Sequence, residues 1–270
     1  MNLISVANET IRIYEKGEYE VNGKKVVFPE GDYRGVFVFS PEMGEEVLRE
    51  EFVIPANPSM CKISVINSDS YAAARRFDKG LVMNFANAHS PGGGFRMGAT
   101  AQEEALCRCS TLYESITSKT AAQMYVYNNT HISNVESDYM LFSKDVLVFR
   151  DEHLNLLEEP FKTSVVTIPA PNRYGAAALA SSEKIKNTFE RRIAIMIKEA
   201  KKLGYRQLVL GAWGCGAFGN KPKDVAEYFK KAITDDKLGY FFDEICFAVY
   251  GKEDGKNITA FSEVFKDCIQ

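Results

Sequence analysis

Residues 81–109 of the 270-residue chain are LVMNFANAHSPGGGFRMGATAQEEALCRC. The first seven are almost continuously apolar, which is typical of a strand buried on both faces of a sheet. Three successive glycines follow, and from about residue 101 the apolar residues take up helical spacing. A buried strand, a glycine loop and an amphipathic helix in this order are the repeating unit of an α/β sheet.

The same alternation continues from Lys62 to the end of the chain. We expect further strands near residues 61–67, 163–170, 206–212 and 244–251, and helices near residues 70–80, 182–203, 223–233 and 258–267. The stretch 118–159 has no clear pattern, and we expect irregular loops there. Together these segments predict an α/β fold in three layers, with one sheet covered by helices on both faces.

The first 58 residues have a different character. Helical spacing at residues 9–16 precedes a β-hairpin pattern, EYEVNGKKVVF, with Asn22 and Gly23 at the turn. A second helical pattern covers residues 41–51, and no linker rich in Pro, Gly or Ser divides the chain. We therefore predict an N-terminal helical and hairpin extension, residues 1–58, packed on one globular core, residues 59–270.

The composition argues against several classes of function. Hydrophobic residues make up 46% and charged residues 26% of the chain, as in an ordinary soluble globular protein. A formal charge of −3 argues against broad electrostatic binding of DNA or RNA, which needs many basic residues. We find neither a secretory signal nor a long apolar run. We therefore expect a cytoplasmic monomer that does not bind membranes.

The scarce metal-binding residues give no support for a metalloenzyme. The three histidines lack helical pair spacing, and the six cysteines form no CxxC motif, so we expect neither a metal nor a cofactor. The cysteines are predicted to be reduced, buried thiols. Cys215 lies between glycines and resembles a nucleophile, but no histidine is near it in the sequence.

Two glycine loops each follow a predicted buried strand. The first contains Gly92–Gly94, and the second lies in LGAWGCGAFGN at residues 210–220. In open α/β sheets, ligands bind beyond the carboxyl ends of strands, and glycines there let backbone N–H groups approach an anion closely. Two such loops predict one phosphate-bearing ligand that is held from two sides.

The second loop also matches the GxGxxG pattern of dinucleotide-binding dehydrogenases at Gly214–Gly219. In that class, however, the third glycine packs against a helix that starts at once, whereas here the helix is expected only after Pro222. The loop also occurs late in the chain, and the nearest acids, Asp235 and Asp236, precede the next strand. A dehydrogenase is therefore the weaker alternative.

A pair of carboxylates opens the helix that follows the first glycine loop. Seven residues separate Gly94 from Gln102, Glu103 and Glu104. A structural explanation is available, because Thr100 and Glu103 have capping-box spacing and first-turn acids stabilise a helix by ~0.3–1 kcal/mol. A carboxyl beside a phosphate site also suits glycosidic cleavage in a nucleotide sugar, where one acid protonates the leaving oxygen and then activates water.

At these positions the sequence resembles the microbial-type poly(ADP-ribose) glycohydrolases, a branch of the macrodomain fold. The pattern of that family is a triple glycine, a short spacer and Gln-Glu-Glu, and here the spacer has seven residues. The segments NFANAHSPGGG, EEALCRCSTLY, VLVFRDEHLNLLEEPF and LGAWGCGAFGN are also similar to the family. The resemblance covers about residues 1–250 and implies a three-layer, macrodomain-like α/β fold with a central mixed sheet.

The resemblance also implies roles for individual residues. Glu104 would be the catalytic acid and base, Glu103 would help to hold the substrate ribose, and Asn87 would orient the scissile ribose. The other substrate-binding positions that it implies are Gly92, Gly93, Gly94, Gln102, Gly214, Cys215, Gly216, Ala217 and Phe218. The last five would cradle the diphosphate, with the Phe218 ring near the ribose.

The implied activity is hydrolysis of the ribose–ribose bonds of ADP-ribose polymers, without a metal. The implied partner is ADP-ribose or its polymer, either free or attached to protein. The adenine pocket is less defined, with Asn67, Asp69 and residues 169–172 as candidates. Two alternatives stay open: removal of single ADP-ribose units from protein or nucleic acid, and a non-catalytic ADP-ribose reader, which would not need the Gln-Glu-Glu motif.

Overall fold

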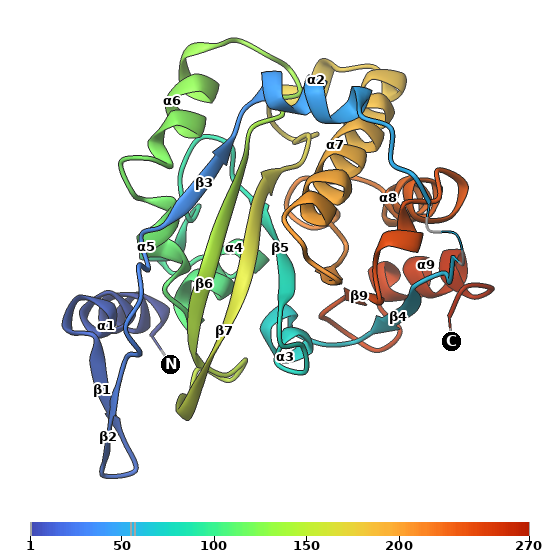
Figure 1. Cartoon of the computed structure of the whole chain (residues 1–270). Coiled ribbons are helices and arrows are strands. Elements are labelled where there is room, and N and C mark those ends of the chain that lie inside the picture. Colours follow the sequence, from blue (N-terminus) through green and yellow to red (C-terminus); the bar gives the residue numbers. More distant parts are fainter. Residues whose placement is uncertain (1, 55, 57, 270) are drawn as a thin grey trace.

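The computed structural model describes residues 2–54, 56 and 58–269 (Figure 1). Its centre is a seven-stranded sheet with the order β3-β6-β7-β5-β8-β9-β4. The strands are β3 (Val36–Phe39), β4 (Lys62–Ile66), β5 (Gly80–Ala86), β6 (Met140–Arg150), β7 (Leu156–Pro169), β8 (Gln207–Leu210) and β9 (Glu244–Ala248). All neighbours from β7 to β4 pair in parallel, whereas β6 is antiparallel to both β3 and β7. The predicted mixed sheet is therefore confirmed.

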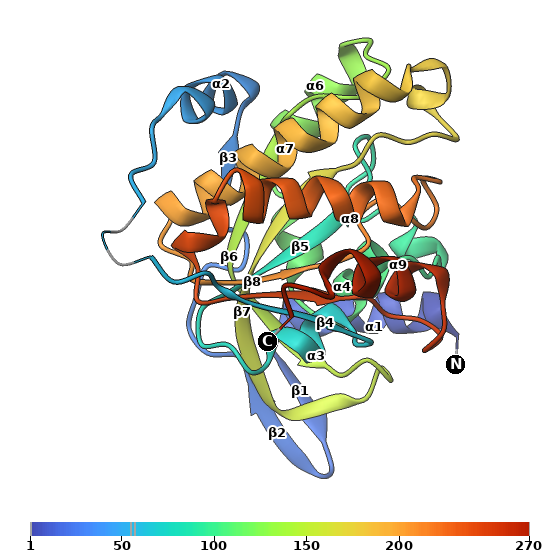
Figure 2. The ribbon, with the colours of Figure 1, turned by 90° about the vertical axis from the view of Figure 1, so that its right-hand side faces the viewer.

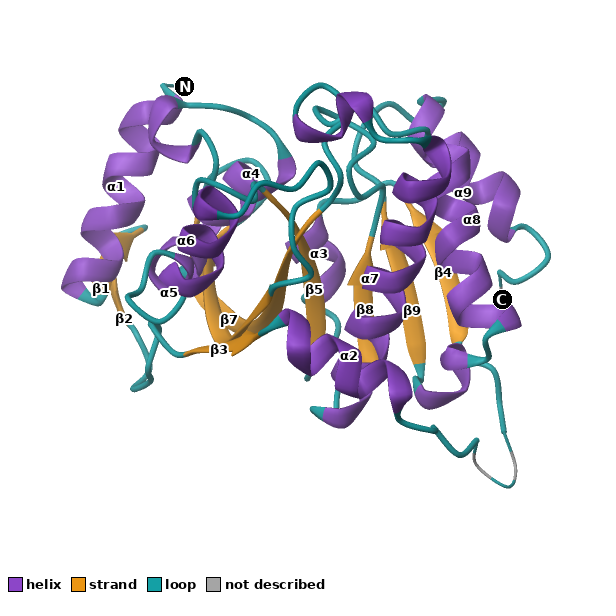
Figure 3. Ribbon diagram, turned by 90° about the horizontal axis from the view of Figure 1, so that it is seen from above, coloured by secondary structure: helices purple, strands orange, loops and turns teal. Residues whose placement is uncertain are grey.

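Helices cover both faces of this sheet (Figures 2 and 3). One face packs against α2 (Pro41–Arg49), α7 (Ser182–Lys202), α8 (Pro222–Lys230) and α9 (Lys256–Phe265). The other packs against α1 (Leu3–Lys16), α3 (Ser70–Ala74), α4 (Gln102–Cys109), α5 (Leu112–Ile116) and α6 (Ala122–Thr130). Along β5, Leu81 and Met83 face the first layer and Val82 the second, as the pleat of a strand requires. The three-layer α/β prediction is confirmed.

The N-terminal segment contains α1 and the expected hairpin, β1 (Glu18–Val21) and β2 (Lys24–Val27), which projects from the body in Figure 1. Asn22 and Gly23 both have positive φ angles, 53° and 74°, as a two-residue hairpin turn requires. The segment also supplies β3, so it forms one edge of the sheet as well as packing on it. Two residues close to the predicted boundary, 55 and 57, and the chain ends 1 and 270 lie outside the described residues. The division into 1–58 and 59–270 stays a prediction.

Two further segments differ from expectation. The stretch 118–159 contains α6, β6 and the start of β7 rather than irregular loops. The apolar run of β6 is interrupted by a register shift between Ser143 and Val146, where Asp145 has a φ of 56°. The helix expected from residue 101 onward ends at Cys109, because Ser110 has an extended backbone and bridges to Val148 of β6.

The sheet places the two glycine loops next to each other. β5 and β8 are parallel neighbours, with Leu81 opposite Leu208, so their carboxyl ends lie at the same edge. At that edge Gly211 packs against Phe85, and a Cβ added to Gly211 would lie 2.9 Å from the Phe85 ring.

None of the described helices combines the length and the apolar composition that a bilayer crossing requires.

Candidate active site

Gln102 fastens the first turn of α4 to β5. Its Oε1 accepts a hydrogen bond of 2.9 Å from the backbone N–H of Phe85. Its Nε2 donates to the carbonyl of Met83 at 2.8 Å and to Ser70 Oγ at 3.2 Å. Both amide protons of Gln102 are thus used within the protein. Gln102 thus positions the helix that carries the two glutamates, and its role in substrate binding stays a prediction.

Glu103 links that helix to the loop after β5. Its Oε2 accepts a hydrogen bond of 2.7 Å from the backbone N–H of Asn87. Its Oε1 accepts from the N–H of Gly92 at 3.2 Å and from Asn84 Nδ2 at 3.3 Å. The side chain is buried, and this burial raises the pKa of Glu103 to about 8. Glu103 therefore sets the path of the backbone around Asn87 and the triple glycine.

The capping box expected from Thr100 and Glu103 is not formed. Ala101 is the N-cap of α4, and no side chain caps the first turn. The two acids are also not solvated, since Glu103 is 3% and Glu104 8% exposed. The reason is that both carboxylates accept hydrogen bonds from N–H groups of the glycine loop, which covers the start of the helix.

Glu104 is held by one oxygen and has the other unpaired. Its Oε1 accepts a hydrogen bond of 2.9 Å from the N–H of Gly94. Its Oε2 is buried and has no hydrogen-bond partner among the described residues. Gly93, with a φ of +53°, passes so close that an added Cβ would collide with Oε1. A fixed carboxyl with one unpaired oxygen is suited to proton transfer with a bound molecule.

The side-chain amide of Asn87 has a fixed orientation. Its Oδ1 accepts hydrogen bonds from the backbone N–H groups of His89 at 2.9 Å and Ser90 at 3.0 Å, which fixes the orientation of the amide. Its Nδ2 has no partner in the described part of the chain. It is free to donate to a sugar hydroxyl.

The second glycine loop is held in place by two buried side chains, those of Trp213 and Asn220. Trp213 is fully buried, and its Nε1 donates to the carbonyl of Ile168 at 3.1 Å. Asn220, also buried, donates through Nδ2 to the carbonyls of Pro171 at 2.8 Å and Gly214 at 3.0 Å. These bonds close the loop on itself and hold it to the segment after β7.

Residues 216–218 of this loop can bind an anion through their backbone N–H groups. The backbone N–H groups of Gly216, Ala217 and Phe218 have no hydrogen-bond partner within residues 2–54, 56 and 58–269. Gly216 and Ala217 are exposed and Phe218 is half-buried. Consecutive unpaired N–H groups form a nest for phosphate oxygens. α8 begins only at Pro222, so Gly219 does not pack against a helix start as the dehydrogenase motif requires.

Cys215 is not placed to be a nucleophile. It is 1% exposed, and burial raises the pKa of its thiol to about 12, far above neutral pH. All six cysteines are free, and only Cys268 is not fully buried. In the described part of the chain, no three His, Cys, Asp or Glu side chains gather as a metal site.

The candidate adenine residues are largely used within the protein. The Asn67 amide exchanges two hydrogen bonds with the backbone of Gly251, at 2.9 Å and 3.1 Å. Asp69 Oδ1 caps α3 by accepting from the N–H groups of Tyr71 and Ala72. Oδ1 of Asn172 likewise accepts from the N–H of Tyr174. The stretch 169–172 lies against the second glycine loop, because Asn220 donates to the carbonyl of Pro171.

Three residues that support the site were missed at the level of sequence. Asn84 is the one polar residue in the apolar run of β5, a signal that could have identified it. Arg108, which donates to the carbonyl of Ala99 at 2.5 Å, follows Glu104 by one helical turn. Asn128 lies in α6, in the stretch without a clear pattern, and its Nδ2 donates to the carbonyl of Ala88 at 3.1 Å.

Comparison with known proteins identifies a matching family and several similar crystal structures. The model of the family described as microbial-type PARG (poly(ADP-ribose) glycohydrolase), catalytic domain, matches residues 7–151. The crystal structure of PARG from Thermomonospora curvata is 36% identical and superposes with a TM-score of 0.89, covering 97% of this chain and 99% of that one. The same enzyme bound to the inhibitor ADP-HPD gives 36% identity, a TM-score of 0.87 and coverage of 97% and 98%. PARG from Deinococcus radiodurans in complex with ADP-ribose is 32% identical, with a TM-score of 0.77 and coverage of 87% and 96%. A comparison with curated proteins gave no match.

The three-layer fold, the glycine loop and the buried glutamate pair define a macrodomain-like α/β protein with a glycosidase-type site. More particularly, the matched family and the extent of the structural similarity show that the chain belongs to the microbial-type poly(ADP-ribose) glycohydrolases.

Proposed function

We propose that this protein hydrolyses the ribose–ribose bonds of ADP-ribose polymers and releases ADP-ribose. The observation that carries the proposal is Glu104, a buried carboxyl with one oxygen bound to Gly94 and the other without a hydrogen-bond partner among the described residues. At the same sheet edge, the amide nitrogen of Asn87 and three backbone N–H groups of the neighbouring loop have no partner in the described part of the chain.

The chemistry follows from this arrangement. Glu104, as the acid, gives its proton to the leaving ribose oxygen while the glycosidic bond breaks and the remaining ribose gains oxocarbenium character. The resulting carboxylate then takes a proton from the attacking water, whose oxygen bonds to the anomeric carbon. Glu104 is thereby reprotonated, and no other reactant is needed.

The surrounding groups fix the substrate. Asn87 Nδ2 donates to a hydroxyl of the scissile ribose, and the N–H groups of Gly216, Ala217 and Phe218 hold the diphosphate. Glu103 helps to place the ribose indirectly, because both of its oxygens bind the loop that carries Asn87. Backbone amides bind phosphate without adding charge, so a net charge of −3 does not conflict with this ligand.

The similar structures support ADP-ribose as the ligand, since the Deinococcus enzyme was solved with ADP-ribose and the Thermomonospora enzyme with ADP-HPD. Our proposal further includes polymer attached to protein as a substrate, and a monomer that acts in the cytoplasm. Release of ADP-ribose from modified protein tests the first of these three points, the mass in solution tests the second, and fractionation of cells tests the third.

The variant Glu104→Gln tests the catalytic assignment. We expect release of ADP-ribose from automodified polymer to fall at least about a hundredfold, as the loss of a general acid and base does. The dissociation constant for ADP-ribose should change less than about threefold, because the fold and the binding groups persist. Glu46→Gln, an exposed substitution in α2, is the matched control. Unchanged turnover in Glu104→Gln would exclude Glu104 as the catalytic residue.

The substrate that the protein cuts distinguishes the proposed function from its two alternatives, a mono-ADP-ribosyl hydrolase and a non-catalytic ADP-ribose reader. Wild-type protein is incubated in parallel with polymer and with mono-ADP-ribosylated protein, and the released products are analysed. Faster release from the mono-ADP-ribosylated protein would favour the mono-ADP-ribosyl hydrolase, and no release from either would favour a reader. The unpaired Glu104 Oε2 argues against the reader, because binding alone gives no reason to bury it.

A further inference from the structure

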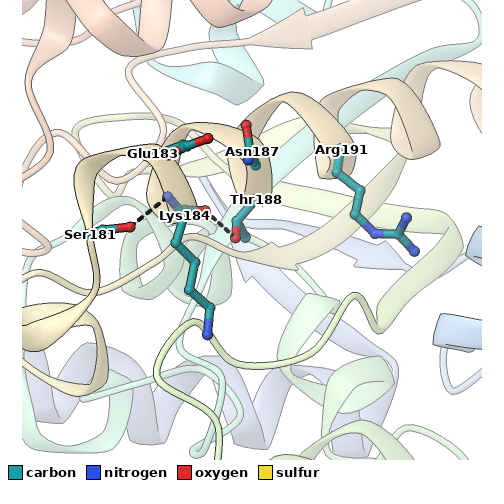
Figure 4. A pocket seen from close by; sticks show the side chains of 6 residues that line it. All are labelled: Ser181, Glu183, Lys184, Asn187, Thr188 and Arg191. Atoms are coloured by element: carbon teal, nitrogen blue, oxygen red, sulfur yellow. Dashed lines mark hydrogen bonds between the residues drawn. The ribbon is translucent and has the colours of Figure 1, made fainter.

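Two adjoining cavities border α7, and neither is lined by the candidate catalytic residues. The larger, of about 470 Å³, lies between the end of α6, the segment 132–138, the start of α2 and α7. The smaller, of about 320 Å³, follows the first turns of α7 and is drawn in Figure 4. Thr188 and Arg191 line both cavities, so the two lie side by side.

The wall of the larger cavity is bonded directly to the catalytic loop. Asn128, which lines it, donates to the carbonyl of Ala88 at 3.1 Å and accepts from the N–H of Ser137 at 3.2 Å. Glu136, also a lining residue, lies 3.2 Å from His89 Nε2. Ala88 and His89 directly follow Asn87. The cavity therefore begins beside the residue proposed to orient the scissile ribose.

The order of the strands shows which part of a polymer would reach this cavity. In the proposed function, the terminal ADP-ribose has its ribose at the end of β5 and its diphosphate at the neighbouring β8 loop. The bond that is cut lies at the β5 end, so the rest of the polymer continues away from β8, toward β7. The larger cavity lies there, since Arg192, a lining residue, donates to the carbonyl of Pro169, the last residue of β7, at 2.9 Å.

The charges in this cavity do not favour phosphate. Arg191 and Arg192 both bind Asp138, at 2.6 Å and 2.8 Å, and Arg191 also binds Glu45 at 2.8 Å. The two guanidinium charges are thereby compensated. A ligand without charge suits this cavity better than a diphosphate does.

Aromatic side chains supply a surface for such a ligand. The rings of Tyr127 and His131, which both line the cavity, are stacked with centroids 3.8 Å apart and planes 6° apart. Tyr139 supports Tyr127 from 5.1 Å, and His131 is exposed. Flat stacks of this kind bind nucleobases without regard to sequence.

We propose that the larger cavity is a subsite for the adenosine of the second ADP-ribose unit, the one that leaves after cleavage. This inference rests on the proposed function. The bond that is cut joins the terminal ribose to the ribose of that adenosine, so its adenine is the first base beyond the reacting atoms. The adenine stacks on His131, and the compensated charges tolerate an uncharged nucleoside.

The test compares a ligand of two ADP-ribose units with ADP-ribose alone, by calorimetry on Glu104→Gln, in which the longer ligand is not cut. We expect the two-unit ligand to bind about tenfold more tightly, because one stacked base contributes ~1–3 kcal/mol. Adding His131→Ala should remove this preference and leave the affinity for ADP-ribose unchanged, whereas His131→Phe should keep it. His153→Ala, an exposed histidine between β6 and β7, is the matched control.

Three results would overturn the subsite: equal affinity for both ligands, a preference that survives His131→Ala, or equal weakening of both ligands by that substitution. His131→Phe keeps an aromatic ring on Tyr127, so a preference that is lost in His131→Ala and kept in His131→Phe excludes a general structural effect. The binding ratio does not depend on turnover. If wild-type protein cuts no polymer yet the ratio depends on His131, the proposed function fails and the subsite stands.

Discussion

The backbone N–H of Asn87 and Oε2 of Glu103 are joined by a hydrogen bond of 2.7 Å that connects the end of β5 to the first turn of α4. The carboxyl is buried, and burial raises its pKa to about 8. Glu103 is thus a group whose protonation in the folded protein differs from that in the unfolded chain at neutral pH.

This difference predicts a pH dependence of stability. The folded-state pKa of Glu103 lies above its ordinary value of 4.5, so the folded protein binds the extra proton between about pH 4.5 and 8. Its contribution to stability is therefore complete below that window and is lost as the pH rises through it. The slope is at most about 1.4 kcal/mol per pH unit. Urea unfolding at several pH values should show this fall in wild type and not in Glu103→Gln; equal slopes would contradict the raised pKa.

Gly93→Ala should separate catalytic geometry from stability. The added Cβ collides with Glu104 Oε1, so we expect turnover to fall about a hundredfold through displacement of the carboxyl. Gly204→Ala is the control, because Gly204 also has a positive φ but no atom lies within 4 Å of the added Cβ. That variant should lose about 1 to 2 kcal/mol of unfolding free energy and keep its turnover. Similar turnover in the two variants would show that Gly93 does not set the position of Glu104.

Arg108 should act by positioning the loop over Glu104. Its Nη2 donates to the carbonyl of Ala99 at 2.5 Å, while its Nη1 is buried without a partner among the described residues. In Arg108→Met we expect turnover to fall about tenfold and hydrogen exchange in residues 94–99 to become faster. Arg108→Lys should recover part of the turnover. The exposed Arg49→Met is the control, and unchanged exchange in Arg108→Met would contradict the role.

Asn220→Ala should weaken ligand binding by loosening the second loop. The substitution removes the side-chain hydrogen bonds to the carbonyls of Pro171 and Gly214, of which the Gly214 carbonyl keeps only its bond from the backbone N–H of residue 220. We expect the dissociation constant for ADP-ribose to rise about tenfold, with a smaller effect on turnover at saturating polymer. Calorimetry and initial rates measure the two effects, with the exposed Asn187→Ala as control. Unchanged affinity would mean that this loop does not hold the diphosphate.

Much of the fold could be predicted because buried parallel strands are continuous apolar runs. The run before Asn87 was found in this way, together with the helix that follows the glycines. β3 was missed because its four residues give too short a pattern beside Gly35, and β6 because Lys144 and Asp145 interrupt it at a register shift. Neither strand belongs to a strand–helix–strand unit, which is the pattern that identified the others.

The candidate site was predictable in its residues but not in its contacts. Spacing placed Glu103 and Glu104 at a helix start, where capping by Thr100 is the usual arrangement. The partners of Glu103 are instead the N–H groups of Asn87 and Gly92, and only the folded path of the loop brings them close. The amide of Gln102 likewise binds the backbone of β5, a contact that no local pattern reveals.

The positions of β3 and β4 have a consequence for synthesis of the chain. The two strands follow each other in the sequence yet occupy opposite edges of the sheet, opposite Ser143 and Glu244, respectively. Both are made by the ribosome long before their neighbours, so neither edge can be closed during early translation. We expect the nascent chain to expose β3 until β6 has emerged and β4 until β9 has emerged, and to depend on chaperones during that interval.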